Sequence, residues 1–526
     1  MVPIRLFVSG WSVVFLSYFS VGYQNAVLNV ANDVFLDLIN SSYIKHGYAS
    51  TISVSGLHAL YSIVVSLWQI GCIFGSLFAC VLEEKFGRKS VLLSIASSVQ
   101  LAGSLIMVLA PIFNCFELLA LGRFIAGLSS GLVCPTLRVF LCEISPNAYR
   151  GYLNGPGGFV LSLSSMIALG LAQPSIFGTP QRVLYLLGFC IIPSIAQLLI
   201  SPCLPASPKY LYIQKGDSPE AIKAIFFYHG PEANVAKLFH EYELEKELAH
   251  DQLTFRKALA TPTVRVPIIL AAVIALAHSS VGVDIVEAYS TKIFVQLGMD
   301  LPSAKNSSIV FNVPGLIGGI VAIFIGDRVG RRPLLLGTMG AAILYNILFV
   351  VLSLSSRLFG FNWSIGASAV ALTGLYIFLY SIGPGAVAEA IFAEFSPQNV
   401  RAAIGSLSEF TFWASNSIFI FAFPPLLMLV GPYAFLMYTI PLVICVLYMA
   451  YAMPETAGRS VVEIAEDIIT ANLEEEGDDE QEERDEVLPV NAADGTADFL
   501  PIAGNTSITT DSIDNQRSFL ISPERA

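Results

Sequence analysis

Long apolar segments dominate this chain and follow one another with short interruptions. Twelve of them are long enough to cross a bilayer, which takes about 20 residues of α-helix. They lie at residues 7–30, 57–82, 90–110, 115–142, 151–172 and 183–203, and then at 266–297, 306–326, 333–354, 366–392, 402–429 and 432–453. The pattern therefore predicts an all-α membrane protein with twelve transmembrane helices in two six-helix halves.

Polar segments separate the two halves and follow the second one. We expect an N-terminal half at 1–203, a cytoplasmic linker at 204–263, a C-terminal half at 264–456 and an acidic cytoplasmic tail at 457–526. Within the linker, residues 218–228 and 232–250 are typical of short amphipathic helices, and Ser218 before Pro219 is the expected N-cap. The acidic block at 474–483 cannot bury apolar area, so we expect the tail to be disordered.

Charged turns recur at similar offsets in the two halves. The turn Gly-Arg-Lys at 87–89 recurs as Gly-Arg-Arg at 330–332, which is 243 positions later. A spacing of seven residues from Glu to Arg also occurs twice, from Glu143 to Arg150 and from Glu394 to Arg401. Several signals at nearly one offset indicate a duplicated half.

Basic side chains decide the orientation in the membrane. Short loops of one parity carry Lys85, Arg88, Lys89, Arg150, Arg328, Arg331, Arg332 and Arg401. Because Lys and Arg are retained on the cytoplasmic side, we expect these loops and both termini to be cytoplasmic. Loops of the other parity carry Asn-x-Ser sequons at Asn40, Asn306 and Asn362, which predicts a glycoprotein with three acceptor sites. The sequon at Asn505 lies in the tail and should be inert.

Composition supports a membrane protein and argues against other classes. Hydrophobic residues make up 55% of the 526 residues and charged residues only 13%, against roughly a quarter in soluble chains. The net charge of −12 comes from the tail, since residues 455–526 hold 19 acidic and 4 basic side chains. The eight Cys lie in apolar segments without a CxxC pair, so neither a disulfide framework nor a metal site is expected. No nucleophile–base pair or phosphate loop indicates an enzyme or a cofactor. The expected partners are the lipid bilayer and a small solute, with no nucleic acid, and partners of the tail stay unknown.

Several motifs resemble the sugar porter (facilitative glucose transporter) family of the major facilitator superfamily. They are Gly122-Arg123-Phe-Ile-Ala-Gly127, Glu143-Ile-Ser-Pro, Pro205-Ala-Ser-Pro-Lys209, Tyr289-Ser-Thr-Lys-Ile-Phe294, Gly383-Pro-Gly385, Trp413-Ala-Ser-Asn416 and Pro454-Glu-Thr-Ala-Gly-Arg459. They occur in the family's order between about residues 10 and 465. The resemblance implies the major facilitator fold and alternating access, in which two halves rock around a central site.

The resemblance also implies which residues gate the transporter. Ion pairs between helix ends on the cytoplasmic side are expected to involve Arg88, Arg150, Arg331 and Arg401 with Glu143 and Glu394. Such pairs exchange partners when the halves move, which suits a two-state latch. The broken helix at Gly383, Pro384 and Gly385 is the implied hinge.

The expected solute site departs from the family pattern. Family members hold sugar hydroxyls with amide and indole side chains, which can donate and accept hydrogen bonds, and most of those amides are missing here. Ionisable side chains stand within the apolar segments instead: His278, Asp284, Glu287 and Glu389. Such groups should face the interior cavity or a partner, and Arg138 is a candidate partner. We expect solute contacts from Gln24, Asn25, His278, Ser279, Asp284, Glu389, Trp413 and Asn416.

Three functions remain open from the sequence. The first is facilitated alternating-access transport of a small polar solute, a monosaccharide or related polyol, in the plasma membrane. Gln24 favours it, since proton-coupled members usually have Asp there. The second is a divergent porter of a charged or non-sugar solute, with or without proton linkage. Asp284, Glu287 and Glu389 motivate this hypothesis. Asp284 and Glu287 can share a helix face next to Gly282, where the helix can break, and two carboxylates on one face favour binding of a proton or cation. The third is a transport-dead nutrient sensor that signals through the tail.

Overall fold

A computed structural model describes residues 4–48, 52–146, 152–153, 155–249, 262–394 and 401–455 of the protein. Every regular element in these ranges is a helix, and one compact unit covers Met1–Ala457. The acidic tail predicted at 457–526, and with it the expected disorder, lies outside the described residues.

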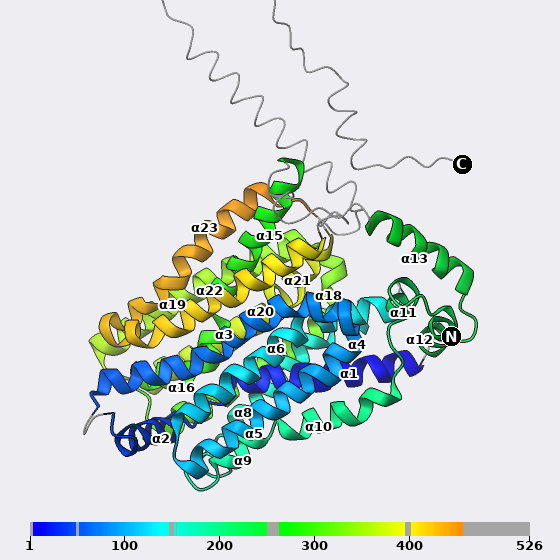
Figure 1. Ribbon diagram of the computed structural model, residues 1–526. Coiled ribbons are helices and arrows are strands. Elements are labelled where there is room, and N and C mark those ends of the chain that lie inside the picture. Colours follow the sequence, from blue (N-terminus) through cyan, green and yellow to red (C-terminus); the bar gives the residue numbers. More distant parts are fainter. Residues whose placement is uncertain are drawn as a thin grey trace, which may run out of the picture. The chain divides into compact units, whose positions relative to one another are not determined.

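The N-terminal half contains the helices of six spans, most of which are labelled in Figure 1. They are α1 (Ile4–Ala26), α3 (Val54–Phe86), α4 (Arg88–Ser90) with the π-helix η1 (Val91–Ala96) and α5 (Ser97–Phe113), α6 (Phe116–Ile144), α8 (Pro156–Leu171), and α9 (Val183–Gly188) with α10 (Ile191–Ile200) and the 3-10 helix η3 (Ser201–Cys203). An additional helix, α2 (Asn32–Lys45), lies between the first two spans. The sequence analysis did not predict it and placed the Asn40 sequon in a loop.

The C-terminal half repeats the arrangement. Its spans are α15 (Pro262–Ser280) with α16 (Val283–Leu297), α17 (Leu301–Val310) with α18 (Val313–Val329), α19 (Arg331–Phe359), α20 (Trp363–Ile382) with α21 (Pro384–Glu394), α22 (Arg401–Val430), and the 3-10 helix η4 (Gly431–Phe435) with α23 (Leu436–Ala452). The Asn306 sequon therefore lies on α17, and Asn362 caps the start of α20.

The number of spans agrees with the prediction. Nine stretches of the described residues are individually long and apolar enough to cross a membrane. One of them, Leu407–Ala452, holds most of α22 and all of α23. The shorter helices α8 and α18, of 16 and 17 residues, add the remaining two. The protein is therefore an all-α membrane protein with twelve helical spans.

Three spans of the C-terminal half are broken. Gly282 separates α15 from α16, and Gly383 separates α20 from α21, where the sequence predicted both breaks. The segment predicted as one helix at 306–326 is instead divided into α17 and α18 around Asn312. Pro314 in the first turn of α18 explains this break, because proline has no amide hydrogen to continue the helical bonds of α17.

The described part of the linker, residues 204–249, forms three short helices, α11 (Pro208–Ile213), α12 (Ser218–His229) and α13 (Val235–Ala249). The α12 helix is amphipathic as predicted, since Ala221, Ala224, Ile225 and Tyr228 are buried at helical spacing. Its N-cap differs from the prediction: the Asp217 side chain accepts from the Glu220 amide at 3.1 Å, and Ser218 is already helical. An ionised carboxylate accepts this bond more strongly than a serine hydroxyl does.

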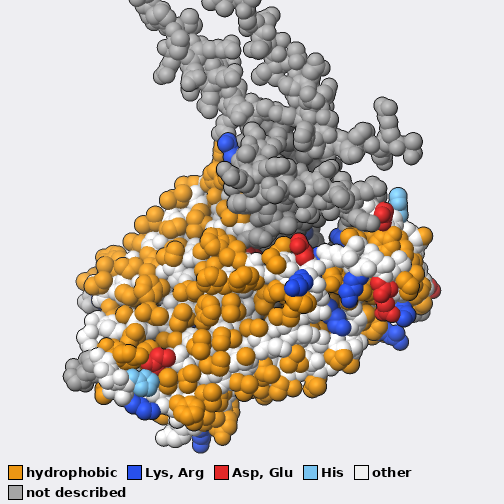
Figure 2. Space-filling view, viewed as in Figure 1, with side chains coloured by type: hydrophobic (Ala, Val, Ile, Leu, Met, Phe, Trp, Pro, Cys, Tyr) orange, Lys and Arg blue, Asp and Glu red, His pale blue; other side chains and the backbone are white. Residues whose placement is uncertain are grey.

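The helices run between two ends of the bundle. The start of α1 lies beside α11 and α12, and we call this the linker end, whereas α2 lies at the opposite end, the α2 end (Figure 1). Figure 2 shows a broad hydrophobic flank between the ends, with charged side chains gathered near the ends. The two halves pack on each other mainly through α3 against α22 and α8 against α18.

Candidate functional site

Two acidic residues of α16 lie inside the helix bundle directly after the break in span seven. Gly282 adopts a φ of +92°, a left-handed conformation that favours glycine, and α16 starts at the next residue. Asp284 therefore lies in the first turn of a helix, where the helix dipole favours a negative charge. Glu287 follows three residues later on the same helix face and is 8% exposed.

Side chains from both halves converge on these carboxylates. Asn25 Nδ2 on α1 donates to Glu287 Oε2 at 2.7 Å and to Asp284 Oδ1 at 2.9 Å. Asn416 Nδ2 on α22 donates to Asp284 Oδ2 at 2.5 Å, and Ser165 Oγ on α8 donates to Glu287 Oε2 at 3.1 Å. These five residues, the acid–amide cluster, join spans one and five to spans seven and eleven.

The acid–amide cluster has the chemistry to bind hydroxyl groups. Ionised carboxylates only accept hydrogen bonds, whereas carboxamides donate and accept. A solute hydroxyl, which does both, can pair with either. Burial of carboxylates costs free energy unless hydrogen bonds replace their hydration, and the four bonds above do so. The Oδ1 atom of Asn25 is buried without a hydrogen-bond partner among the described residues, so it is available as an acceptor.

A small cavity lies one helical turn along α22 from Asn416. It is lined by Cys134, Ala275, His278, Ser408, Glu409, Phe412 and Trp413. His278 Nε2 lies 3.0 Å from the Tyr380 hydroxyl, and the His278 ring packs on Phe412 with 4.8 Å between centroids. Trp413 packs edge-on against Trp68 of the other half, with 5.6 Å between centroids. The aromatic walls and few polar groups resemble the lining of a small-molecule site, but the cavity volume of about 20 Å³ is too small for a sugar.

Glu409 is a residue of this cavity that the sequence analysis missed. It forms an ion pair with Arg138 of α6 and accepts a hydrogen bond from Trp413 Nε1 at 3.0 Å. The pair joins the two halves on the linker-end side of the cavity. Arg138 was predicted as a candidate partner of the ionisable residues in spans seven and ten, and the structure shows it paired with Glu409. The Glu389 side chain lies outside the described residues, so its pairing with Arg138 stays a prediction. Glu409 is itself an ionisable residue within an apolar segment, so the criterion that selected Asp284 would have found it.

Gln24 faces Arg123 of α6 and not the acid–amide cluster. Arg123 Nη1 donates to the backbone oxygen of Gln24 at 2.5 Å and to the side-chain oxygen of Gln24 at 3.2 Å. Arg123 Nη2 donates to the backbone oxygen of Val65 at 3.1 Å. Arg123 is only 1% exposed, and its guanidinium lies 5.6 Å from the centroid of the Trp68 ring. These acceptors stabilise a buried side chain that keeps its charge.

The other predicted solute contacts are distributed as follows. Ser279 Oγ lies 2.6 Å from Ser415 Oγ, so it is bonded within the C-terminal half. Glu389 lies on α21, but its side chain lies outside the described part of the chain. The structure thus brings Asn25, Asp284 and Asn416 together, and places His278 and Trp413 at the neighbouring cavity.

One of the predicted gating pairs forms between described residues. Arg88 Nε lies 3.1 Å from Glu143 Oε1, which joins the start of span three to the end of span four. The Arg331 amide donates to Glu455 Oε1 at 3.0 Å, so the second charged turn contacts the residues after α23. The side chains of Glu394 and Arg401, and the whole of Arg150, lie outside the described residues.

Contacts near the α2 end also join the halves, and the sequence analysis did not predict them. Asn29 Nδ2 donates to the backbone carbonyl oxygen of Glu287 at 2.6 Å and to Ser290 Oγ at 2.7 Å. The backbone amide of Thr291 donates to Asn29 Oδ1 at 3.2 Å. Lys305 Nζ of α17 lies 3.1 Å from both carboxylate oxygens of Asp33 on α2. The acid–amide cluster therefore lies between closed contacts on either side.

A duplicated twelve-span bundle whose halves meet on buried polar groups defines an alternating-access transporter. Residues 9–468 match the family described as sugar (and other) transporters, and the chain belongs to that family. The protein is therefore a multi-pass membrane transporter with the major facilitator fold.

Curated relatives and solved structures agree with this assignment. The chain is 30% identical over 446 residues to facilitated glucose transporter member 1 of Gallus gallus, covering 84% of this chain and 89% of the relative. It is 30% identical over 452 residues to member 4 of Homo sapiens, covering 84% and 87%. The fold resembles the proton:xylose symporter XylE bound to 6-bromo-6-deoxy-D-glucose, with a TM-score of 0.70, 19% identity, and coverage of 89% of this chain and 99% of that one.

Proposed function

We propose that the protein transports a monosaccharide by facilitated alternating access, with the acid–amide cluster as its central binding site. The observation that carries this proposal is the meeting of Asn25 and Asn416, one from each half, on the carboxylate of Asp284. Facilitated glucose transporters of about 30% identity support the solute class. The expected partners are therefore a hexose or related polyol and the lipid bilayer.

The hydroxyl groups of a sugar can replace the bonds that now hold the cluster together. Two neighbouring hydroxyls can donate to the two oxygens of Asp284, which in this structure accept hydrogen bonds from the two amides. The freed amides of Asn25 and Asn416 can then donate to sugar oxygens. The Trp413 ring, beside the cavity, offers an apolar face to the carbon skeleton. Where the family has amides that donate and accept, this chain has carboxylates that only accept hydrogen bonds. Because polyol hydroxyls can donate, the site still fits a polyol.

Alternating access requires the contacts on either side of the cluster to break in turn. Opening at the α2 end separates Asp33 from Lys305 and Asn29 from α16, while opening at the linker end separates Arg138 from Glu409. The break at Gly383 supports the proposed hinge, since α20 and α21 have no continuous helix between them and a Cβ there would overlap Thr338. We also propose that Glu394 and Arg401 act with Arg88, Glu143, Arg150 and Arg331 in gating.

Uptake of radiolabelled hexose into proteoliposomes tests the proposal. We expect saturable uptake that an unlabelled hexose inhibits and that an imposed inward proton gradient leaves unchanged. Protein-free liposomes and the Asn25→Ala/Asn416→Ala variant serve as controls, the variant being checked for its thermal unfolding midpoint. Absence of hexose uptake by folded wild-type protein would contradict the proposal.

A second candidate function is transport of a cationic solute, or of a solute together with a proton. It is favoured by one observation: two carboxylates, Asp284 and Glu287, share the single amide nitrogen of Asn25 inside the bundle. Two negative charges so close together favour binding of a proton or cation. An inward proton gradient that drives hexose above its equilibrium concentration, and fails to do so in Glu287→Gln, would support this candidate over simple facilitation.

We propose that the protein functions in the plasma membrane with both termini cytoplasmic. The basic turns at 87–89 and 330–332 support this orientation because Lys and Arg are retained inside. The sequons at Asn40 and Asn306 lie on α2 and α17, away from the linker end, and both side chains have solvent access. Such positions suit glycosylation on the extracellular side.

A further inference from the structure

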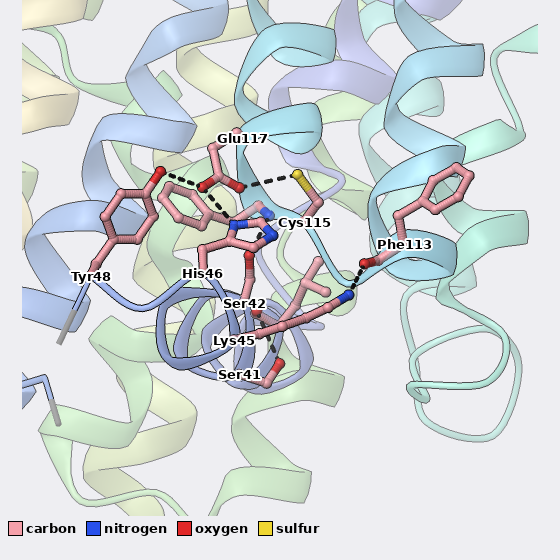
Figure 3. Close-up of polar contacts among 10 residues, drawn as sticks. Ser41, Ser42, Lys45, His46, Tyr48, Phe113, Cys115 and Glu117 are labelled. Carbon is pink, nitrogen blue, oxygen red and sulfur yellow. Dashed lines mark hydrogen bonds and ion pairs between the residues drawn. The ribbon is translucent and has the colours of Figure 1, made fainter. Parts of the chain in front are cut away.

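Three metal-ligating side chains meet at the α2 end of the N-terminal half (Figure 3). His46 follows α2, whereas Cys115 and Glu117 lie at the turn into α6. His46 Nδ1 lies 3.0 Å from Glu117 Oε1, and Cys115 Sγ donates to Glu117 Oε2 at 3.1 Å. All three donor atoms lie within 4.8 Å of one another, and no other group of this kind occurs among the described residues.

A network of hydrogen bonds holds the two segments together beneath these side chains. The Phe116 amide donates to Ser42 Oγ at 2.9 Å, and Ser41 Oγ donates to Asn114 Oδ1 at 2.9 Å. Lys45 Nζ donates to the Phe113 carbonyl at 2.7 Å, so its charge is directed away from the Glu117 carboxylate (Figure 3). The ligands therefore stand on a support that is already formed, which reduces the entropic cost of binding.

The three side chains match the ligand preferences of zinc. Zn²⁺ binds thiolate, imidazole and carboxylate at about 2.0–2.3 Å in a tetrahedron, which places ligand atoms roughly 3.3–3.7 Å apart. The observed separations of 3.0 and 3.1 Å, with an upper limit of 4.8 Å, require small adjustments to reach this geometry. The side chains of His46 and Glu117 are 32% and 36% exposed, so an ion can reach them.

We propose that His46, Cys115 and Glu117 bind a Zn²⁺ ion, with water as the fourth ligand. The Tyr48 hydroxyl donates to Glu117 Oε1 at 3.0 Å and so orients that carboxylate. On binding zinc, the Cys115 thiol releases its proton to solvent and binds as the thiolate, and the His46 imidazole binds through an unprotonated Nδ1. The sequence analysis expected no metal site, since 71 residues separate His46 from Glu117 and no ligand spacing marks them.

Zinc at this site connects α2 to the start of α6. The other end of α2 carries Asp33, which pairs with Lys305 of the C-terminal half. Bound zinc therefore stiffens the helix that links the halves at the α2 end, and we expect it to slow opening there. The site itself does not depend on which solute the protein transports.

Titration of the purified full-length protein with ZnCl₂, followed by calorimetry, tests the site. We expect about one Zn²⁺ per chain. Cys115→Ser and His46→Ala should each weaken Zn²⁺ binding at least about tenfold, because even substitution of a residue that hydrogen-bonds to a metal ligand lowers metal affinity about 10–100-fold. Co²⁺ in place of Zn²⁺ should give the absorption of a cobalt–thiolate bond, which Cys115→Ser abolishes. Cys203→Ser, at an exposed cysteine outside the cluster, is the matched control and should bind as the wild type does.

A second measurement needs no substitution and covers the case in which a variant fails to fold. Zn²⁺ should slow alkylation of Cys115 in the wild-type protein, as mapped by peptide mass spectrometry, and leave Cys203 unaffected. Equal alkylation of Cys115 with and without Zn²⁺, or unaltered Zn²⁺ affinity in folded Cys115→Ser, would overturn the proposal. Because the readout is binding, failure of the hexose proposal would leave this result unchanged.

Discussion

Arg138 on α6 and Glu409 on α22 form an ion pair between the two halves, and Glu409 also accepts a hydrogen bond from the Trp413 indole. The side chains of Arg138 and Glu409 are 24% and 12% exposed, so the pair is largely shielded from water. A charged contact that also holds an aromatic side chain of the cavity links the conformation of the halves to the shape of that cavity.

We predict that Glu409→Gln and Arg138→Gln each lower hexose uptake by about tenfold, because each removes the shielded ion pair between the halves. The double variant Arg138→Gln/Glu409→Gln should lose less than the two single effects combined, since both substitutions remove the same ion pair. Initial uptake rates and thermal unfolding midpoints of all four proteins measure the coupling. Strictly additive effects would show that the two residues act independently.

We predict that Asp284→Asn raises the KM for hexose by about tenfold or more, because a hydrogen bond to a charged group contributes about 1.5–3 kcal/mol. The substitution also removes an acceptor shared by Asn25 and Asn416. The matched control is Asp37→Asn, the same chemical change at an exposed position on α2. An unchanged KM in Asp284→Asn would exclude this carboxylate from the binding site.

The two side chains of the Asp33–Lys305 ion pair differ in exposure, so their substitutions should lower the free energy of unfolding by different amounts. The Lys305 side chain is 3% exposed and that of Asp33 is 48% exposed. Asp33→Asn leaves the buried Lys305 ammonium group without its carboxylate and should lower the free energy of unfolding by about 1–3 kcal/mol. Lys305→Met leaves only the solvated Asp33 carboxylate unpaired and should lower the free energy of unfolding by less than Asp33→Asn does. Comparison of the thermal unfolding midpoints of the two variants decides the matter, and equal losses would contradict the argument.

Gly282→Ala should destabilise the fold by at least about 1 kcal/mol, because the left-handed backbone disfavours a side chain. Its new Cβ would also lie 2.7 Å from the Tyr438 ring. Gly337→Ala, in the exposed interior of α19 with nothing within 4 Å, is the control and should be neutral or stabilise by about 0.5–1 kcal/mol. Thermal unfolding in detergent measures both, and equal shifts would refute the role given to the break.

Glycosylation tests the proposed orientation. Protein from eukaryotic cells should shift in gel mobility after N-glycosidase treatment, and the triple variant Asn40→Gln/Asn306→Gln/Asn362→Gln should migrate like the treated wild type. Asn505→Gln, at the sequon in the tail, is the control and should leave the shift unchanged. A shift that depends on Asn505 and not on the other three would reverse the assigned sides.

The sequence by itself determined the membrane class, the number of spans, the duplicated halves and two of the three helix breaks. Length and hydropathy fix spans because the bilayer core has a fixed thickness, and Gly282 and Pro384 mark breaks through their own backbone chemistry. Ionisable residues in apolar segments pointed to Asp284 and Glu287 because their burial is costly. These are local properties, which each stretch of sequence carries alone.

Only the tertiary structure decided which side chains meet. Asn25 contacts Glu287 across 262 positions, and Arg138 contacts Glu409 across 271, and no local pattern encodes either pairing. Helix α2 was missed because its short amphipathic segment lies between spans, where hydropathy gives little signal. The three zinc ligands were missed because they are separated in the chain and only packing brings them together. Hydrogen bonds and ion pairs depend on distance in space, which one-dimensional spacing does not specify.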